Sequence, residues 1–170
     1  TVHVSHNVEE AFSVADRAAI FNEGILQQVG SLDELLRKPN SEFVARFMRC
    51  ENIFCGEAGR QDADGSKTVV KVNGIEIMVP GRHSGKVKFI IRPEDVLVLP
   101  GGEAGLDNEN SFNVSLVRWR SYGSYVRVEF DGSLNVVAHL TAAVFARLKG
   151  IGNKELKIRL GIEDIHVLEV

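Results

Sequence analysis

The 170-residue sequence is poor in cysteine, tryptophan and proline, and it contains no long apolar run. Its two cysteines, Cys50 and Cys55, form no Cys-x-x-Cys pair of the kind that binds zinc. We therefore predict no metal site and two free, partly buried thiols. No segment approaches the roughly 20 apolar residues of a membrane-spanning helix, so we expect no direct membrane insertion.

The sequence also lacks an excess of positive charge. It has 20 Lys and Arg against 23 Asp and Glu, for a net charge of -3. Proteins that bind nucleic acids usually present a clearly basic face. Trp119, Tyr122 and Tyr125 lie among arginines and could stack on bases, but packing at a strand end explains them more simply. We expect no nucleic-acid partner.

A phosphate-binding loop, Gly-x-x-x-x-Gly-Lys-(Ser/Thr), is missing as well. The nearest segment, residues 81–87, has three residues between its glycines instead of four, and Val87 stands where a hydroxyl is required. The segment also leads into an expected strand, which offers no helix N-terminus to a phosphate. We predict that this chain alone neither binds ATP tightly nor hydrolyses it.

The first fifty residues combine short helices with one hairpin. Residues 1–4 read as a short apolar strand that runs into His6 and then into a helix opening with Glu9 and Glu10. These carboxylates complement the dipole of a helix N-terminus, which is the simplest role for them. Residues 18–30 predict a hairpin that turns at residues 22–24.

Two helix starts follow this hairpin. Ser31 and Glu34 have the spacing of a capping box, and Pro39 ends the short helix that they begin. Ser41 then caps a second helix, which fades by Arg49.

From Asn52 onward, apolar residues alternate with polar ones, and glycines separate the short runs. Asn73-Gly74 is typical of a type I′ hairpin. The segment 94–99, Glu-Asp-Val-Leu-Val-Leu, returns as Glu-Asp-Ile-His-Val-Leu at 163–168. We interpret this part as two five-stranded, barrel-like lobes that end alike, with a seam near residues 100–110.

Two motifs resemble a known family. Ser5-His6-Asn7-Val8-Glu9-Glu10-Ala11 resembles the switch (H-loop) of ATP-binding-cassette (ABC) transporter ATPases, and Ile91-Arg92-Pro93-Glu94-Asp95-Val96 resembles the TOBE regulatory domain of the importer type. The expected fold is therefore mainly β with a small α/β N-terminal piece. Residues 1–50 would be the end of a nucleotide-binding domain, and residues 51–170 a TOBE domain of small barrel lobes related to the oligonucleotide-binding fold.

The resemblance implies a role in transport. In the family, the histidine at the position of His6 contacts the γ-phosphate of ATP, and the intact subunit uses ATP and Mg²⁺. Its implied partners are a second copy of the ATP-binding subunit and a membrane permease, at the cytoplasmic face of the membrane. The family's Leu-Ser-Gly-Gly-Gln signature and Walker B carboxylates do not occur here. We therefore expect a piece of a longer subunit, in which His6 alone is not catalytic.

The second lobe is most similar to that of molybdate/tungstate importers, which have an oxyanion site there. Their Ser-Ala-Arg-Asn run falls on residues 107–110, and their lysine falls on Gly161. Asn110, Ser111 and Thr141 remain as candidate ligands. Because Asp107 and Glu109 add two carboxylates here and the family's arginine and lysine are both lost, we predict a degenerate site that binds no oxyanion.

Alternatives to this interpretation stay open. The cargo could be a sugar, a polyamine or ferric iron instead of molybdate or tungstate. The chain could also be a stand-alone barrel that binds an oxyanion or another small ligand without a role in transport. The apolar side chains of the N-terminal piece need cover, so we expect either an oligomer or poor order before about Ser41. These side chains are Val2, Val4, Phe12, Ile20, Phe21 and Val29.

Overall fold

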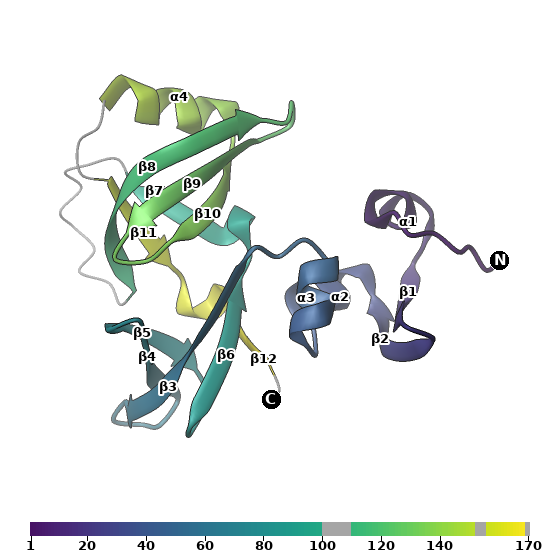
Figure 1. Ribbon diagram of the computed structural model, residues 1–170, viewed down its shortest axis with the longest axis horizontal. Helices are drawn as coiled ribbons and strands as arrows, with labels where there is room; N and C mark the ends of the chain where they lie inside the picture. Colours follow the sequence, from purple (N-terminus) through teal and green to yellow (C-terminus); the bar gives the residue numbers. More distant parts are fainter. Residues whose placement is uncertain (100–109, 152–155, 169–170) are drawn as a thin grey trace. The chain divides into compact units, whose positions relative to one another are not determined.

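The computed structural model describes residues 1–99, 110–151 and 156–168 (Figure 1). The chain divides into two compact units, which we treat separately. The first comprises Thr1–Cys50 with the chain end from Leu168, and the second comprises Glu51–Val167. Apart from Asn110, the expected seam at 100–110 lies outside the described residues. In the described part, no helix is long and apolar enough to cross a bilayer.

The first unit contains one hairpin and three short helices. Their bounds are α1 Val8–Val14, β1 Arg17–Asn22, β2 Ile25–Ser31, α2 Leu32–Arg37 and α3 Glu42–Phe47. The hairpin turns as predicted, because Glu23 and Gly24 have φ values of 49° and 78°. Both halves of the capping box at Ser31 are present, and the Ser41 side chain accepts a hydrogen bond from Val44 N.

The strand predicted at residues 1–4 is wrong. No strand of the described chain pairs with this segment, and Val2 and Val4 are 93% and 91% exposed. An apolar pattern does not suffice for a strand, because its backbone groups need a neighbouring ladder. Farther along, Ile20 is only 5% exposed and belongs to a small core with Leu35, Val44 and Met48.

The second unit consists of two five-stranded sheets. The first has the order β12-β6-β3-β4-β5, and the second has the order β10-β9-β8-β11-β7. The bounds are β3 Asn52–Gln61, β4 Lys67–Val72, β5 Ile75–Pro80, β6 Lys86–Ile91, η1 Pro93–Asp95, β7 Val96–Leu99, β8 Ser111–Ser121, β9 Val126–Gly132, β10 Val136–Leu140, α4 Ala142–Ile151, β11 Leu156–Leu160, η2 Ile162–Asp164 and β12 Ile165–Leu168.

The two sheets exchange their last strands, which sequence reasoning did not foresee. After β6 of the first sheet, the chain passes through the turn η1 into β7, which pairs with β11 of the second sheet. After β11 of the second sheet, the chain passes through η2 into β12, which pairs with β6 of the first sheet. The repeated Glu-Asp segments therefore cross between the sheets, and a division of the sequence near residue 100 does not separate their strands.

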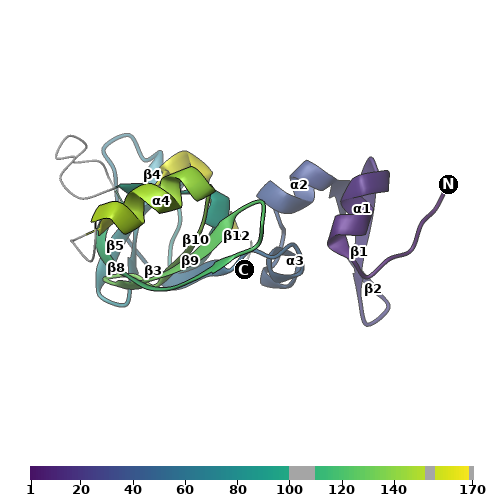
Figure 2. The same cartoon turned by 90° about the horizontal axis from the view of Figure 1, so that it is seen from above.

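The exchange produces one continuous core. Buried side chains from both sheets belong to a single cluster that includes Phe89 of β6 and Val128 of β9, each 0% exposed. α4 covers one end of the second sheet (Figure 2), where the ring centroids of Phe145 and Trp119 are 4.9 Å apart. Asn73 and Gly74 have φ values of 48° and 90°, which confirms the expected type I′ turn.

Candidate functional site

His6 lies in the first unit, just before α1. Its side chain is exposed, and no hydrogen bond in the described part of the chain holds its ring. The neighbouring residues order the start of the helix: Asn7 Oδ1 accepts from Glu9 N at 3.0 Å, and His3 Nε2 lies 3.3 Å from Glu10 Oε1. The other predicted site residues, Asn110, Ser111 and Thr141, belong to the second unit.

Asn110 joins the two sheets of the second unit. Its side chain is 7% exposed, accepts a hydrogen bond from Met78 N at 2.7 Å and donates one to Met78 O at 2.8 Å. Its own carbonyl accepts from Leu160 N at 3.0 Å. The amide group that sequence analysis offered to an oxyanion is thus engaged by the backbone of β5.

The other candidate ligands have separate surroundings. Ser111 Oγ is buried without a hydrogen-bond partner among the described residues. Thr141 caps α4, since its Oγ1 accepts from Val144 N at 3.3 Å. Gly161 precedes η2, and a Cβ added there would lie 2.5 Å from Asp164 Oδ2. The structure describes no hydrogen bond between Asn110, Ser111 and Thr141. Asp107, Asn108 and Glu109 lie outside the described residues.

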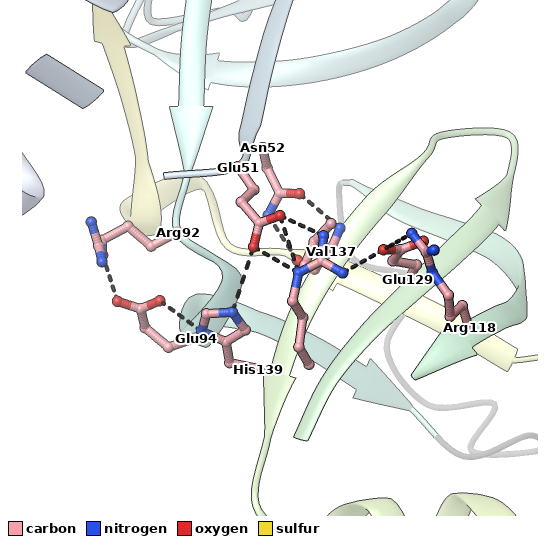
Figure 3. A network of polar contacts seen from close by, with 9 residues as sticks. Glu51, Asn52, Arg92, Glu94, Arg118, Glu129, Val137 and His139 are labelled. Atoms are coloured by element: carbon pink, nitrogen blue, oxygen red, sulfur yellow. Dashed lines mark hydrogen bonds and ion pairs between the residues drawn. The ribbon is translucent and has the colours of Figure 1, made fainter. Parts of the chain in front are cut away.

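A second buried asparagine makes the same kind of bridge as Asn110. Asn52, at the start of β3, is 3% exposed. Its Nδ2 donates to Val137 O, and its Oδ1 accepts from Val137 N, both at 2.8 Å (Figure 3). Because Val137 belongs to β10, this side chain extends the hydrogen bonding of the second sheet to the first.

Charged side chains surround this bridge on the outer face of the second sheet. Arg127 Nε donates to both carboxylate oxygens of Glu51, at 2.9 and 3.1 Å. Arg127 also pairs with Glu129, which in turn accepts a bidentate pair from Arg118 at 2.7 and 3.0 Å. Two carboxylates and two guanidiniums are thereby linked in the order Glu51, Arg127, Glu129 and Arg118, and Glu51 immediately precedes the bridging Asn52 (Figure 3).

His139 occupies the other end of this network. Its Nε2 is 3.8 Å from Glu51 Oε1, and its Nδ1 is 3.8 Å from Glu94 Oε2 (Figure 3). Both distances are too long for hydrogen bonds. Glu94 is instead held by Arg92, and the His139 ring packs against Tyr125 with 4.2 Å between ring centroids. His139 Nε2 is buried and has no hydrogen-bond partner among the described residues.

The network changes the acidity of its members. Hydrogen bonds from Arg118 and then Arg127 lower the pKa of Glu129 to about 2. The hydrogen bond to Glu51 is the main reason why the pKa of Arg127 is raised. Burial lowers the pKa of His139, although the charges of Glu94 and Glu51 act in the opposite direction. At neutral pH Glu129, Arg118 and Arg127 are therefore charged and His139 is neutral.

Sequence analysis did not recognise this network. One signal for it was present: Arg127 and Glu129 are two residues apart in an alternating segment, so they share a strand face. Another was the Asn-x-Phe that opens each half, at Asn52 and at Asn110. The contact of Glu51 with Arg127 had no local signal, because it joins segments far apart in the chain.

No protein-family model matches the sequence. Individual proteins do match it. The molybdate/tungstate import ATP-binding protein WtpC of Pyrococcus abyssi is 32% identical over 149 residues, which are 87% of this chain and 41% of WtpC. The WtpC of Pyrococcus horikoshii is 32% identical over 167 residues, or 98% of this chain and 46% of that protein. The spermidine/putrescine import ATP-binding protein PotA of Borreliella afzelii is 30% identical over 170 residues, 98% of this chain and 44% of PotA.

The chain is a homologue of ABC-importer ATP-binding subunits. This confirms the resemblance that the two motifs indicated. The match extends over both units of this homologue, yet the chain spans less than half the length of the curated relatives it matches.

The fold has a counterpart among solved structures. The cytoplasmic molybdate-binding protein ModG, crystallised with molybdate bound, superposes with a TM-score of 0.60 over 71% of this chain and 97% of ModG. The sequences are only 12% identical, so the likeness concerns the fold alone. It confirms the expected fold class, a mainly β structure with small barrel-like lobes and a short mixed N-terminal piece.

Proposed function

We propose that this chain is the C-terminal part of the ATP-binding subunit of an ABC importer and that its second unit is a regulatory TOBE domain. The observation that carries the proposal is the match of both units, 98% of the chain, to import ATP-binding proteins. In the intact subunit, ATP and Mg²⁺ would bind to the part that this chain lacks, and His6 would contact the γ-phosphate. A second copy of the subunit and a membrane permease would be the partners, at the cytoplasmic face.

The test of this role is ATP turnover. The 170-residue chain should not hydrolyse ATP, whereas the subunit translated from the complete coding sequence should do so together with its permease. His6→Ala in that complete subunit should abolish turnover while ATP still binds, because the phosphate-binding loop would be intact. Turnover by the 170-residue chain alone, or an active His6→Ala subunit, would contradict the proposal.

Molybdate or tungstate is the first candidate for the cargo, supported by the WtpC relatives. We further propose that the second unit does not sense this oxyanion. The side-chain amide of Asn110 is hydrogen-bonded to the backbone of Met78, and Gly161 has no cationic side chain. Calorimetric titration of the chain with molybdate and with tungstate should give no saturable heat.

A stand-alone oxyanion-binding barrel is the second candidate, favoured by the fold of ModG, which aligns over 97% of its length. Micromolar binding of molybdate to this chain would support it. The two candidates also differ in what precedes Thr1 in the coding sequence. A phosphate-binding loop, a signature motif and a Walker B segment there would support the importer subunit.

A further inference from the structure

The chain enters the second unit through residues that are tied to the second sheet. Glu51 follows Cys50, the last residue of the first unit, and is held by Arg127 of β9. Asn52 comes next and pairs with both backbone groups of Val137 on β10. We call these contacts of Glu51 and Asn52 the junction anchor. These contacts hold the start of β3 to strands β9 and β10 of the second sheet.

His139 lies next to the junction anchor, two residues after Val137 on the same strand, β10. It lies directly opposite Arg127 in the ladder of β9 and β10. Glu51 approaches its Nε2 and Glu94 of η1 approaches its Nδ1, each at 3.8 Å. Arg92 and Tyr125 complete the charged and titratable groups around the ring. The ring thus stands between two carboxylates without a hydrogen bond to either.

Protonation would change this balance. A neutral imidazole donates one hydrogen bond, whereas an imidazolium donates two and carries a positive charge. To reach hydrogen-bond distance, Glu51 must move toward the ring, and its carboxylate is the one that Arg127 holds. The carboxylate of Glu94 would likewise have to accept a hydrogen bond from the ring in addition to its ion pair with Arg92. Charged His139 therefore competes with both guanidiniums for their partners.

We propose that His139 is a proton-operated switch that loosens the junction anchor as the pH falls below neutrality. In the neutral state, Glu51 stays on Arg127 and Asn52 stays on Val137. In the protonated state, Glu51 turns toward the imidazolium, and the chain around Glu51 and Asn52 moves with it. The switch belongs to the second unit, so it operates in the importer subunit and in the stand-alone barrel alike.

The direction of the pH effect follows from the environment of the ring. Burial lowers the pKa of His139 below its usual 6.5. The unfolded chain therefore binds this proton more readily than the folded chain. Stability contributed by the neutral ring is complete above the unfolded pKa and is lost as the pH falls from there toward the lower folded value.

The Val137 amide reports on the anchor directly, because its N–H is bonded to Asn52 Oδ1. We would measure its hydrogen exchange by NMR at about pH 7.5 and about pH 5, corrected for the intrinsic rate and divided by the exchange of the Val70 amide in the first sheet. This relative protection should fall severalfold from the higher to the lower pH in the wild-type chain. It should stay constant in His139→Gln.

Two further variants make the test specific. His83→Gln removes a histidine that contacts Pro80 O, outside the network, and it should keep the wild-type fall. Glu51→Gln removes the carboxylate that the imidazolium would capture, so the fall should shrink. A constant protection in the wild-type chain, or an equal fall in His139→Gln, would overturn the proposal.

The histidine ring itself supplies an independent readout if His139→Gln does not fold. Its Cε1–H signal in the wild-type chain should titrate below the usual value of 6.5. The Arg127 Nε–H signal should shift at the same midpoint, because the two groups share Glu51. A His139 signal that titrates at or above the usual value, or an Arg127 signal that does not follow it, would contradict the switch.

Discussion

Asn52 and Asn110 perform the same structural task at two ends of the second unit, in different surroundings. Each is buried, and each bonds the N–H and C=O of one residue in the other sheet, Val137 or Met78. Asn52 is flanked by the charged network of Glu51, whereas the described surroundings of Asn110 offer backbone partners. The comparison shows that the fold uses the same asparagine-to-backbone bridge twice to connect its sheets. Among the described residues, only the bridge at Asn52 lies beside a network of ion pairs.

The largest effect is expected from Asn110→Ala. It leaves the N–H and C=O of Met78 without their partner, at about 1–3 kcal/mol for each buried group. It also places alanine at a φ of 65°, a left-handed conformation that costs a further ~1 kcal/mol. Urea unfolding should show a loss on the order of 4 kcal/mol. Asn110→Gly should lose about 1 kcal/mol less, since glycine adopts this φ freely.

Asn52→Ala should have the next largest effect. The same two backbone groups lose their partner, here on Val137, but Asn52 is not among the residues with positive φ. The expected loss is on the order of 3 kcal/mol in urea unfolding. The exposed Asn113 of β8 is the matched control, because Asn113→Ala should stay within about 0.5 kcal/mol of wild type. Equal losses at Asn52 and Asn113 would contradict the bridging role.

Glu129→Gln tests the charges that distinguish the Asn52 junction. The pKa of Glu129 is lowered to about 2 from 4.5, so the ionised group stabilises the fold above the unfolded value, and this contribution is lost as the pH falls toward 2. Between about pH 5 and about pH 3, the unfolding midpoint of the wild-type chain should therefore fall more steeply than that of Glu129→Gln. Parallel pH profiles would show that the network contributes no stability.

The smallest effect is expected from Lys149→Met. Lys149 Nζ lies 4.0 Å from the centroid of the Trp119 ring, and a cation–π contact at an exposed site contributes about 0.5 kcal/mol. Trp119 is the one tryptophan of the chain, so its fluorescence reports on the second sheet alone. The emission should change in Lys149→Met while unfolding shifts little. A loss comparable to that of Asn52→Ala would mean that α4 holds the second sheet through this lysine.

The two units also differ in the size of their buried cores. The second unit has one core that runs through both sheets, while the buried core of the first is small. Phe21, Ile25, Leu26 and Val29 of the β1–β2 hairpin are between 48% and 65% exposed. Phe21 and Val29 belong to the apolar set that sequence analysis singled out, whereas Ile20 of the same set is buried; an oligomer that covers the exposed members stays a prediction.

Local patterns determined most of the elements. The capping box at Ser31, the turn at Asn73-Gly74 and the alternating runs of the second half all act through neighbours in sequence, so they could be recognised without a structure. The segment 1–4 failed because a strand depends on a partner that its own sequence does not supply.

By itself, the sequence determined the mainly β character of the chain, its helix caps and turns, and its kinship with ABC-importer subunits, since all of these reside in short motifs. Only the tertiary structure decided that β7 and β12 exchange sheets, that Asn110 is bonded to Met78, and that Glu51, Arg127 and His139 meet. These contacts join residues far apart in the chain, and their formation depends on how the two sheets close over one core.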